Sequence, residues 1–464
     1  MRLSPENAED AMQLPLALRA SDLASNDIIN WLKRGVWAYF FLLIFEGALR
    51  KWILPGLAAP LLIVRDPIAL WLVVVAWRRG LLTANVYLTG MVVIGIIGII
   101  TATLLGHGSL LIALYGARIL LLHFPLMFVV GRVFTREDVI KMGKATLMIA
   151  IPMVVLVTLQ FYSPQSAWVN RGVGGDMEGA GFSGSMGFFR PPGTFSFTNG
   201  NTNFFSFVAP FAFYFWLDTK AINKLLLIVA TLALFFAVPL SISRGLLFQV
   251  AISLLFVLVA STRKPENLGR LVIAIGAAGL VLGVLSQSSL FTTASEAFTA
   301  RFEVANESEG GLEGVILDRF LGGLISSLTN SSSSALPFFG YGLGMGTNAG
   351  SKLLTGDVKF LIAEGEWGRI IGELGPLMGL SVILLRVGLA IKIARAIYKK
   401  LTRGDLLPWM LLSLGLLNVA QGAWAQPSSL GFCTLIGGLM IASLRLPRPE
   451  PLVAKALLQI SYHD

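Results

Sequence analysis

The chain of 464 residues is 55% hydrophobic and only 13% charged, and its mean hydropathy is +0.75. Soluble domains carry about 25% charged residues and about 45–50% apolar residues. The composition therefore excludes a water-soluble enzyme, a disordered protein and a secreted disulfide scaffold. A single cysteine, Cys433, excludes an intrachain disulfide, and three histidines are too few for a histidine-based metal site. We expect no metal, no cofactor and, despite the net charge of +10, no nucleic-acid partner.

Apolar runs of about 20 residues, the length that crosses a bilayer, recur along nearly the whole chain. This pattern predicts an all-α polytopic membrane protein with about 12 transmembrane helices. The predicted spans are 35–54, 58–77, 84–105, 109–130, 143–162, 202–218, 224–242, 245–261, 270–288, 371–391, 406–424 and 427–444.

Basic residues gather in alternate connecting segments, such as Arg78-Arg79 and the cluster 392–403. The positive-inside rule therefore predicts that these segments and both termini are cytoplasmic. Two outer segments are long, and the larger one contains two amphipathic helical patterns, which predict a folded, partly helical periplasmic loop. The predicted parts are a tail (1–34), nine spans (35–288) with a periplasmic loop (163–201), the large loop (289–370) with its helical patterns (Thr293–Glu307 and Gly314–Leu328), three spans (371–445) and a second tail (446–464).

Several charged residues fall inside the predicted spans. A charge in the middle of a span costs about 2.5–3.5 kcal/mol on insertion scales, so it needs a partner or a cavity. Glu46 and Arg50 lie four residues apart on one helical face, which predicts either an ion pair or a polar lining for an anionic substrate. Arg65 either reaches the outer headgroups or lines a cavity with Arg50. Its neighbour Asp66 cannot share its face of the helix.

Two later spans also carry buried charge. Arg118 and His123 are five positions apart, which is about 140° around an α-helix. This spacing predicts that they do not belong to one site. Arg386 and Lys392 lie towards the inner end of the tenth span, where snorkelling to the inner surface explains both.

The segment that leads into the tenth span is acidic. In a helix, Arg369 lies three residues after Glu366 and four before Glu373, which predicts a carboxylate–guanidinium ladder on one side. Glu364 is about 200° away from Glu366, so one carboxylate can orient an arginine while the other meets substrate. Glu364, with Glu366 as the second choice, is a candidate general base for a sugar hydroxyl. The alternative is a helix start held by local ion pairs.

Arginines recur in the predicted outer segments. Arg244 lies in a short outer turn, where a basic residue goes against the orientation rule. Together with Arg190, Arg319 and Arg369 it gives the outer face several guanidinium groups near the membrane surface. The planar fork of arginine suits phosphate. These residues are therefore candidate diphosphate ligands, and the alternative for each one alone is simple solvation.

Four short motifs occur in a fixed order and carry a resemblance to a known family. The chain resembles the O-antigen ligase/polymerase superfamily over roughly residues 185–445. The motifs are Arg190-Pro-Pro-Gly-Thr-Phe-Ser-Phe-Thr-Asn199, Ser243-Arg244-Gly245, Phe339-Gly340-Tyr-Gly342-Leu-Gly344 and Glu373-Leu-Gly375-Pro-Leu-Met-Gly379.

The resemblance implies a bacterial inner-membrane glycosyltransferase that works at the outer leaflet without a metal. It implies that Arg190 and Arg244 hold the diphosphate of an undecaprenyl-diphosphate donor. We expect Arg50 and Arg65 to help line the donor cavity. Ligases of the family carry a histidine nine residues before the glutamate that aligns with Glu373. This chain has Glu364 there, which favours a polymerase.

We therefore expect a polymerase of lipid-linked oligosaccharide repeat units in surface or exopolysaccharide biosynthesis. Its expected partners are the undecaprenyl-diphosphate oligosaccharide, a glycan acceptor, membrane lipid and other polysaccharide-assembly proteins. One alternative is an O-antigen ligase that transfers the glycan to a lipid or protein. Another, from a different class, is a flippase or secondary transporter, which twelve spans suit equally well. The gathering of polar residues in the outer half favours a transferase.

Overall fold

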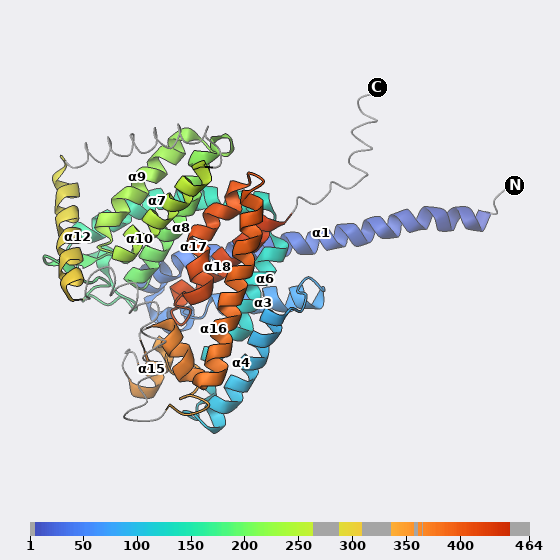
Figure 1. The fold of residues 1–464 in the computed structure, drawn as a ribbon, viewed down its shortest axis with the longest axis horizontal. Coiled ribbons are helices and arrows are strands. Elements are labelled where there is room, and N and C mark those ends of the chain that lie inside the picture. Colours follow the sequence, from blue (N-terminus) through green and yellow to red (C-terminus); the bar gives the residue numbers. More distant parts are fainter. Residues whose placement is uncertain (1–4, 263–286, 309–335, 357–360, 364, 446–464) are drawn as a thin grey trace.

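The computed structural model describes residues 5–262, 287–308, 336–356, 361–363 and 365–445. In this part of the chain nearly all regular structure is helical, which confirms the predicted all-α class (Figure 1). One short antiparallel hairpin, β1 (Phe182–Ser185) and β2 (Phe188–Arg190), is the exception among the described residues.

Most of the helices follow the predicted spans. They are α1 (Pro5–Ala48), α2 (Ala58–Leu61), α3 (Arg65–Arg78), α4 (Val86–Leu104), α5 (Leu110–Arg118), α6 (Phe124–Val133), α7 (Arg136–Tyr162), α8 (Thr198–Leu217), α9 (Lys224–Leu240), α10 (Arg244–Thr262), α12 (Ser289–Ser308), α15 (Asn348–Thr355), α16 (Glu366–Leu401), α17 (Leu406–Gln421) and α18 (Pro427–Leu444). Shorter helical turns are η1 (Leu49–Ile53), η2 (Pro55–Leu57), η3 (Ile119–His123), η4 (Trp168–Asn170) and η5 (Thr219–Ala221).

Eight helical stretches are long and apolar enough to cross a membrane, which supports the predicted membrane class. The helices α9 and α17 are apolar but shorter, α8 covers the predicted span 202–218, and nearly all of the predicted span 270–288 lies outside the described residues. The eight stretches are Asp27–Ile53, Pro55–Arg78, Val86–Leu104, Leu110–Val133, Arg136–Tyr162, Arg244–Thr262, Glu366–Leu401 and Pro427–Leu444.

The C-terminal helix α18 lies at the centre of the bundle. It contacts α6, α7, α8, α16 and α17, and 78% of its apolar window is buried. Glycines let α18 and α6 approach closely: a Cβ atom on Gly131 would lie 2.6 Å from Ile441 Cβ, and one on Gly438 would lie 2.6 Å from Val130 Cβ. Small residues at helix contacts are typical of membrane bundles, because close packing drives association in lipid.

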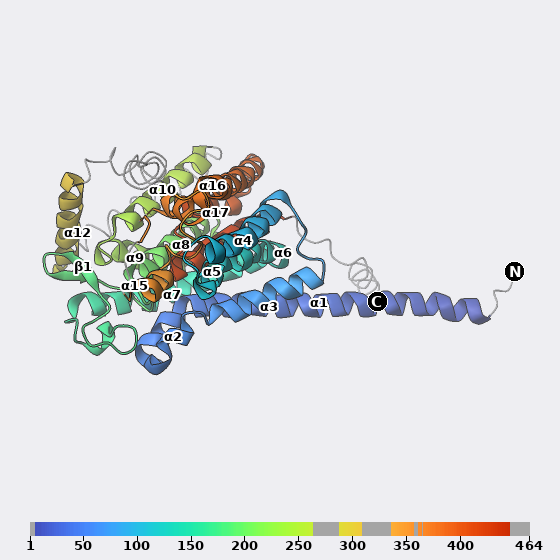
Figure 2. The ribbon, with the colours of Figure 1, turned by 90° about the horizontal axis from the view of Figure 1, so that it is seen from below.

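The connecting segments sort into two ends of the bundle. At one, the basic end, Lys33 forms an ion pair with Asp138 (2.6 Å) and Arg136 with Asp405 (2.7 Å). At the other, the loop end, the long segments meet the short turns, and His107 Nε2 lies 3.1 Å from the Leu343 carbonyl oxygen. Helix α1 projects beyond the bundle towards its N-terminus (Figures 1 and 2).

The glycine-rich segment 163–201 is folded onto α1 and α7. Gln160 of α7 bonds both backbone groups of Gly193: its Nε2 donates to the carbonyl oxygen (3.1 Å), and its Oε1 accepts from the N–H group (2.7 Å). Lys51, whose side chain is fully buried, donates to the same carbonyl oxygen at 2.6 Å. These bonds fix the chain directly after Arg190 on the bundle.

The large segment 289–370 is described only in part. Helix α12 covers the predicted amphipathic stretch Thr293–Glu307 and packs against α9 and β1 at the edge of the bundle (Figure 1). The second predicted stretch, Gly314–Leu328, lies outside the described residues. The loop that carries the Gly340 motif returns to the bundle beside α5 and α16.

Candidate functional site

A buried polar network joins the end of α1 to the start of α3. Glu46, which is 6% exposed, accepts from Arg65 Nε at 2.9 Å and from Arg50 Nη1 at 3.4 Å. The predicted ion pair of Glu46 and Arg50 is therefore present, and Arg65 completes it from the next helix. The helix ends in the π-helical turn η1. Such turns occur often at functional sites.

Asp66 points the other way from Arg65, as expected for adjacent residues. Its carboxylate accepts from Arg118 Nη1 at 2.7 Å, and its other oxygen lies 3.0 Å from His123 Nε2. Tyr39 OH lies 3.0 Å from the second ring nitrogen of His123. We call the set Glu46, Arg50, Arg65, Asp66, Arg118, His123 and Tyr39 the N-terminal network.

The expectation that Arg118 and His123 do not share a site is wrong. Residues 119–123 form the π-helical turn η3, and the Phe124 N–H group bonds the carbonyl oxygen of Ile119, five residues earlier. In such a turn, residues five positions apart come back to nearly the same face. The 140° separation holds for an α-helix only.

The N-terminal network reaches two neighbouring segments. Arg50 Nη1 donates to Ser196 Oγ at 2.9 Å, inside the predicted donor motif. Arg65 Nη2 donates to the carbonyl oxygen of Pro427, the first residue of α18, at 2.8 Å. Both arginines are thus held by protein groups, and Arg65 is only 3% exposed. These contacts favour a positioning role for Arg50 at the segment around Ser196 and for Arg65 at α18.

Helix α16 reverses its direction at Gly375. This residue has φ 76° and ψ 172°, which breaks the helix, and Pro376 follows it. A Cβ atom on Gly379 would lie 2.7 Å from Ile371 Cα, so the chain after the break runs back along the chain before it. Residues 366–374 therefore form a short helix packed against the long helix 376–401. We call this arrangement the α16 hairpin.

The glycine motif around Gly340 supplies N–H donors to the carbonyl oxygens at the end of the short helix. Proline has no N–H group, so Pro376 cannot bond the carbonyl oxygen of Gly372 four residues earlier. The Tyr341 N–H group donates to that oxygen instead (2.8 Å), and the Gly342 N–H group donates to the Glu373 carbonyl oxygen (3.1 Å). Two of the four motifs thus form one structural unit.

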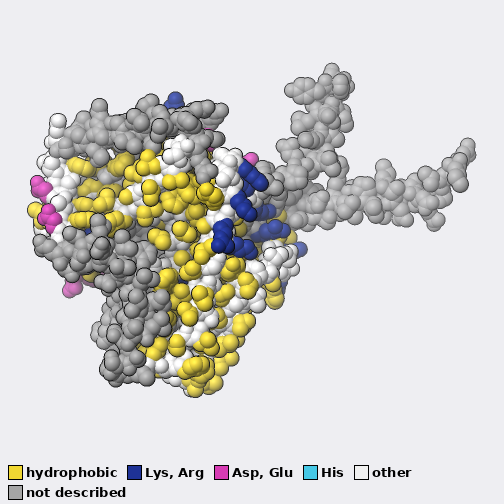
Figure 3. All heavy atoms as spheres, in the orientation of Figure 1, with side chains coloured by type: hydrophobic (Ala, Val, Ile, Leu, Met, Phe, Trp, Pro, Cys, Tyr) yellow, Lys and Arg dark blue, Asp and Glu magenta, His cyan; other side chains and the backbone are white. Residues whose placement is uncertain are grey.

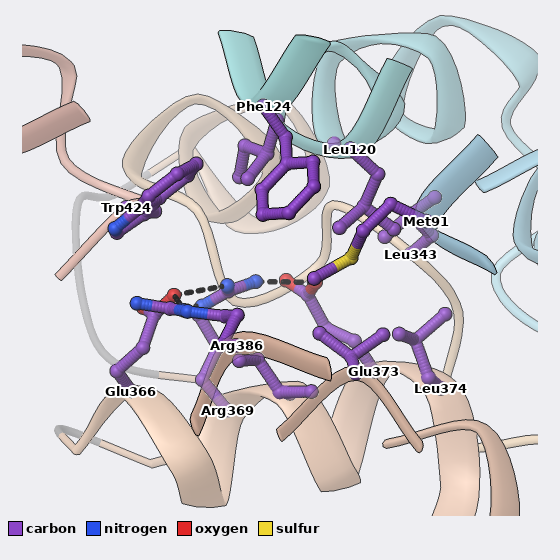
Figure 4. Close-up of a pocket in the computed structure, with 14 residues that line it drawn as sticks. Met91, Leu120, Phe124, Leu343, Glu366, Arg369, Glu373, Leu374, Arg386 and Trp424 are labelled. Carbon is purple, nitrogen blue, oxygen red and sulfur yellow. Dashed lines mark hydrogen bonds and ion pairs between the residues drawn. The ribbon is translucent and has the colours of Figure 1, made fainter. Parts of the chain in front are cut away.

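The α16 hairpin brings together four buried charges. Arg369 donates to Glu366 from Nε (3.1 Å) and Nη2 (2.9 Å), and to Glu373 from Nη1 (2.5 Å). Arg386 Nη1 donates to the same Glu366 Oε1 at 2.9 Å (Figure 4). The Gly346 N–H group donates to the other carboxylate oxygen of Glu373, Oε1, at 2.8 Å. We call Glu366, Arg369, Glu373 and Arg386 the hairpin network.

The predicted ladder of Glu366, Arg369 and Glu373 is confirmed. The prediction that Arg386 snorkels to the inner surface is wrong, because its Nε and Nη2 donate to the carbonyl oxygens of Val419 and Gly422. The four side chains are at most 7% exposed, and the cavity beside them has a volume of only about 10 Å³, near the space of one water molecule. This geometry favours a structural role for Glu366 and Arg369.

The two segments that carry the motif arginines Arg190 and Arg244 contact each other at a different place. A Cβ atom on Gly184 of β1 would lie 2.6 Å from Ile242 Cδ1 and 3.5 Å from Arg190 Cγ. The hairpin that ends in Arg190 thus packs on the turn that carries Arg244. Both arginines are half-buried. Ile242 itself has φ 45°, an uncommon conformation for a β-branched residue, which indicates that its surroundings hold this turn in shape.

The N-termini of α8, α10 and α18 lie next to one another beside this turn. Thr202, in the first turns of α8, donates to Ser243 Oγ just before α10 at 3.2 Å. Asn203 donates to Ser429 Oγ in the first turn of α18 at 2.8 Å. Helix N-termini carry partial positive charge and N–H groups that bind anions. We call the region of Arg190, Arg244 and the first turns of α8, α10 and α18 the convergence site.

Two predicted site residues, Glu364 and Arg319, lie outside the described residues. Among the residues that are described, no three His, Cys, Asp or Glu side chains come together in a group that could hold a metal ion. A comparison of the chain with protein-family models and with curated proteins finds no match.

Proposed function

We propose that the protein is a membrane glycosyltransferase that polymerises oligosaccharide repeat units carried on undecaprenyl diphosphate, in surface or exopolysaccharide biosynthesis. The convergence site is the proposed donor site. The supporting observation is that the hairpin ending in Arg190 packs, through Gly184 and Ile242, on the turn just before Arg244, although the two motifs are about 50 residues apart in the chain. Two guanidinium groups beside helix N-termini suit a diphosphate, because they offer paired donors and positive charge.

The proposed step is a displacement at the anomeric carbon of the donor sugar. The acceptor hydroxyl oxygen forms the new bond to this carbon while the bond to the diphosphate oxygen breaks, and the hydroxyl proton passes to a general base. The diphosphate leaves with the bonding electrons. Arg190 and Arg244 stabilise this developing negative charge. Glu364 remains the proposed base. Glu366 is no longer proposed for this role, because its carboxylate already accepts hydrogen bonds from Arg369 and Arg386.

The proposal predicts that Arg244→Ala lowers the rate of glycan lengthening about 100-fold, in line with the loss of one charged donor to a leaving group. The assay uses the purified protein in nanodiscs with an undecaprenyl-diphosphate oligosaccharide from its host. It measures released undecaprenyl diphosphate and glycan length, with and without EDTA. We expect lengthening with lipid diphosphate release that EDTA does not change.

The matched control is Arg171→Ala, which removes another arginine of the segment 163–201 and should keep the wild-type rate. Equal activity of both variants would refute the donor site. Release without lengthening would indicate a ligase that lacks its acceptor. Movement of the intact lipid-linked glycan between leaflets, without release, would refute the enzyme assignment in favour of a flippase.

A further inference from the structure

A groove at the basic end follows the hairpin network along α16. It has a volume of about 560 Å³ and is formed by the second half of α16 and the first turn of α4. Its described lining contains three cations and no carboxylate. The lining residues are Tyr87, Gly388, Ile391, Lys392, Arg395, Ala396 and Lys399.

The cations of the groove lie on one helical face. Lys392, Arg395 and Lys399 follow each other at spacings of three and four residues, so their side chains project to the same side of α16. All three are exposed. Because like charges at this spacing repel each other, the face gains free energy when an anion binds. Lysine and arginine donors suit a phosphate group.

The floor and one wall of the groove are built from uncharged residues. A Cβ atom on Gly388 would lie 3.4 Å from Tyr87 Cε1, so the tyrosine ring covers the glycine. Lys392 Nζ lies 5.4 Å from the centre of the same ring. Tyrosine is typical of the membrane–water boundary, where its ring is apolar and its hydroxyl is wet. A tyrosine beside a lysine suits the headgroup region of a membrane.

An apolar surface continues from the groove along both helices. Exposed side chains recur on α16 at Leu377, Leu384 and Ile391, and on α4 at Val86 and Val93. Each set has a spacing of seven residues, which gives a stripe along one side of the helix. Figure 3 shows a group of Lys and Arg side chains beside a broad hydrophobic face. This surface suits acyl chains that run parallel to the helices.

We propose that the groove binds an anionic phospholipid of the leaflet at the basic end, with its phosphate on Lys392, Arg395 and Lys399 and its acyl chains along α4 and α16. Basic pockets between membrane helices bind anionic headgroups in this way. The occupant is a lipid because a free phosphate would use the cations but leave the adjoining apolar stripes unused. The proposal is independent of the glycosyltransferase assignment.

The test replaces the three cations with serine in the full chain (Lys392→Ser, Arg395→Ser and Lys399→Ser). The protein is purified from nanodiscs of mixed phosphatidylglycerol and phosphatidylcholine, and native mass spectrometry measures the bound lipid. We expect phosphatidylglycerol to bind the triple variant about 100-fold more weakly, since each basic residue near a membrane contributes about fivefold. Phosphatidylcholine should bind both proteins equally.

The control removes the same charge elsewhere at the basic end, with Arg132→Ser, Lys141→Ser and Lys144→Ser. It should retain phosphatidylglycerol as the wild type does. Equal losses in both triple variants would show a diffuse charge effect and overturn the site. Competition by inorganic phosphate as strong as that by phosphatidylglycerol would overturn the lipid assignment and indicate a soluble anion. All substituted side chains are exposed except that of Lys144, which is half-buried, so the thermal midpoints of the variants should match the wild type and verify the fold.

Discussion

Replacing Glu366 with glutamine should lower the free energy of unfolding by about 3–5 kcal/mol. The carboxylate accepts three hydrogen bonds from Arg369 and Arg386, and all these side chains are almost completely buried. The amide is nearly isosteric but uncharged, so two guanidinium groups would share only Glu373 as a counter-charge. Unfolding in mixed micelles with increasing SDS, followed by tryptophan fluorescence, measures the change.

The matched control is Glu303→Gln, which removes an exposed carboxylate on α12 and should change the stability by less than about 0.5 kcal/mol. A second variant tests the cause. Glu366→Gln combined with Arg386→Met removes one charge of each sign and leaves the pair of Arg369 and Glu373. It should be more stable than the sum of its single changes predicts. Additive losses would contradict the network.

Contacts between near neighbours in the chain could be predicted from the sequence. Glu46 with Arg50, and Arg369 with Glu366 and Glu373, are three or four residues apart in helices, where regular geometry alone brings them together. The apolar spans and the helix over Thr293–Glu307 followed from composition and periodicity in the same way. These features depend only on the regular helix.

Contacts that depend on a departure from the regular α-helix were missed. Arg386 and Glu366 are twenty residues apart, about 30 Å along a straight helix, and they meet only because the chain reverses at Gly375. Arg118 and His123 meet Asp66 because residues 119–123 form a π-turn. The Gly-Pro pair was a visible signal for the first case. We know of no sequence signal for the second.

The N-terminal network and the hairpin network both contact the short connection between α17 and α18. Arg386 binds the carbonyl oxygens of Val419 and Gly422 at the end of α17, and Arg65 binds that of Pro427 at the start of α18. The short turn between these helices is therefore clamped by one arginine from each network. The first turn of α18 borders the convergence site through Ser429, so we expect both networks to position the proposed donor site.

Replacing Gly375 with alanine should lower the free energy of unfolding by more than about 3 kcal/mol. Its φ of 76° is unfavourable for alanine, and the added Cβ atom would lie 2.0 Å from the Phe338 carbonyl oxygen. Backbone on both sides would have to move, including the bonds from Tyr341 and Gly342 that satisfy the end of the short helix. The same SDS titration measures the loss.

Gly108→Ala separates the cost of the backbone conformation from the cost of the steric clash that are combined in Gly375→Ala. Gly108 has a nearly equal φ of 74°, but a Cβ atom there would have no neighbour within 4 Å, so only the backbone term of about 1–2 kcal/mol is expected. Equal losses at both positions would contradict the steric argument.

The double variant of Gly375→Ala with Glu366→Gln then tests the link between the reversal and the hairpin network. If the reversal brings Glu366 to Arg386, a displaced hairpin has already lost that contact. The glutamine should then cost much less than it does in the wild-type background.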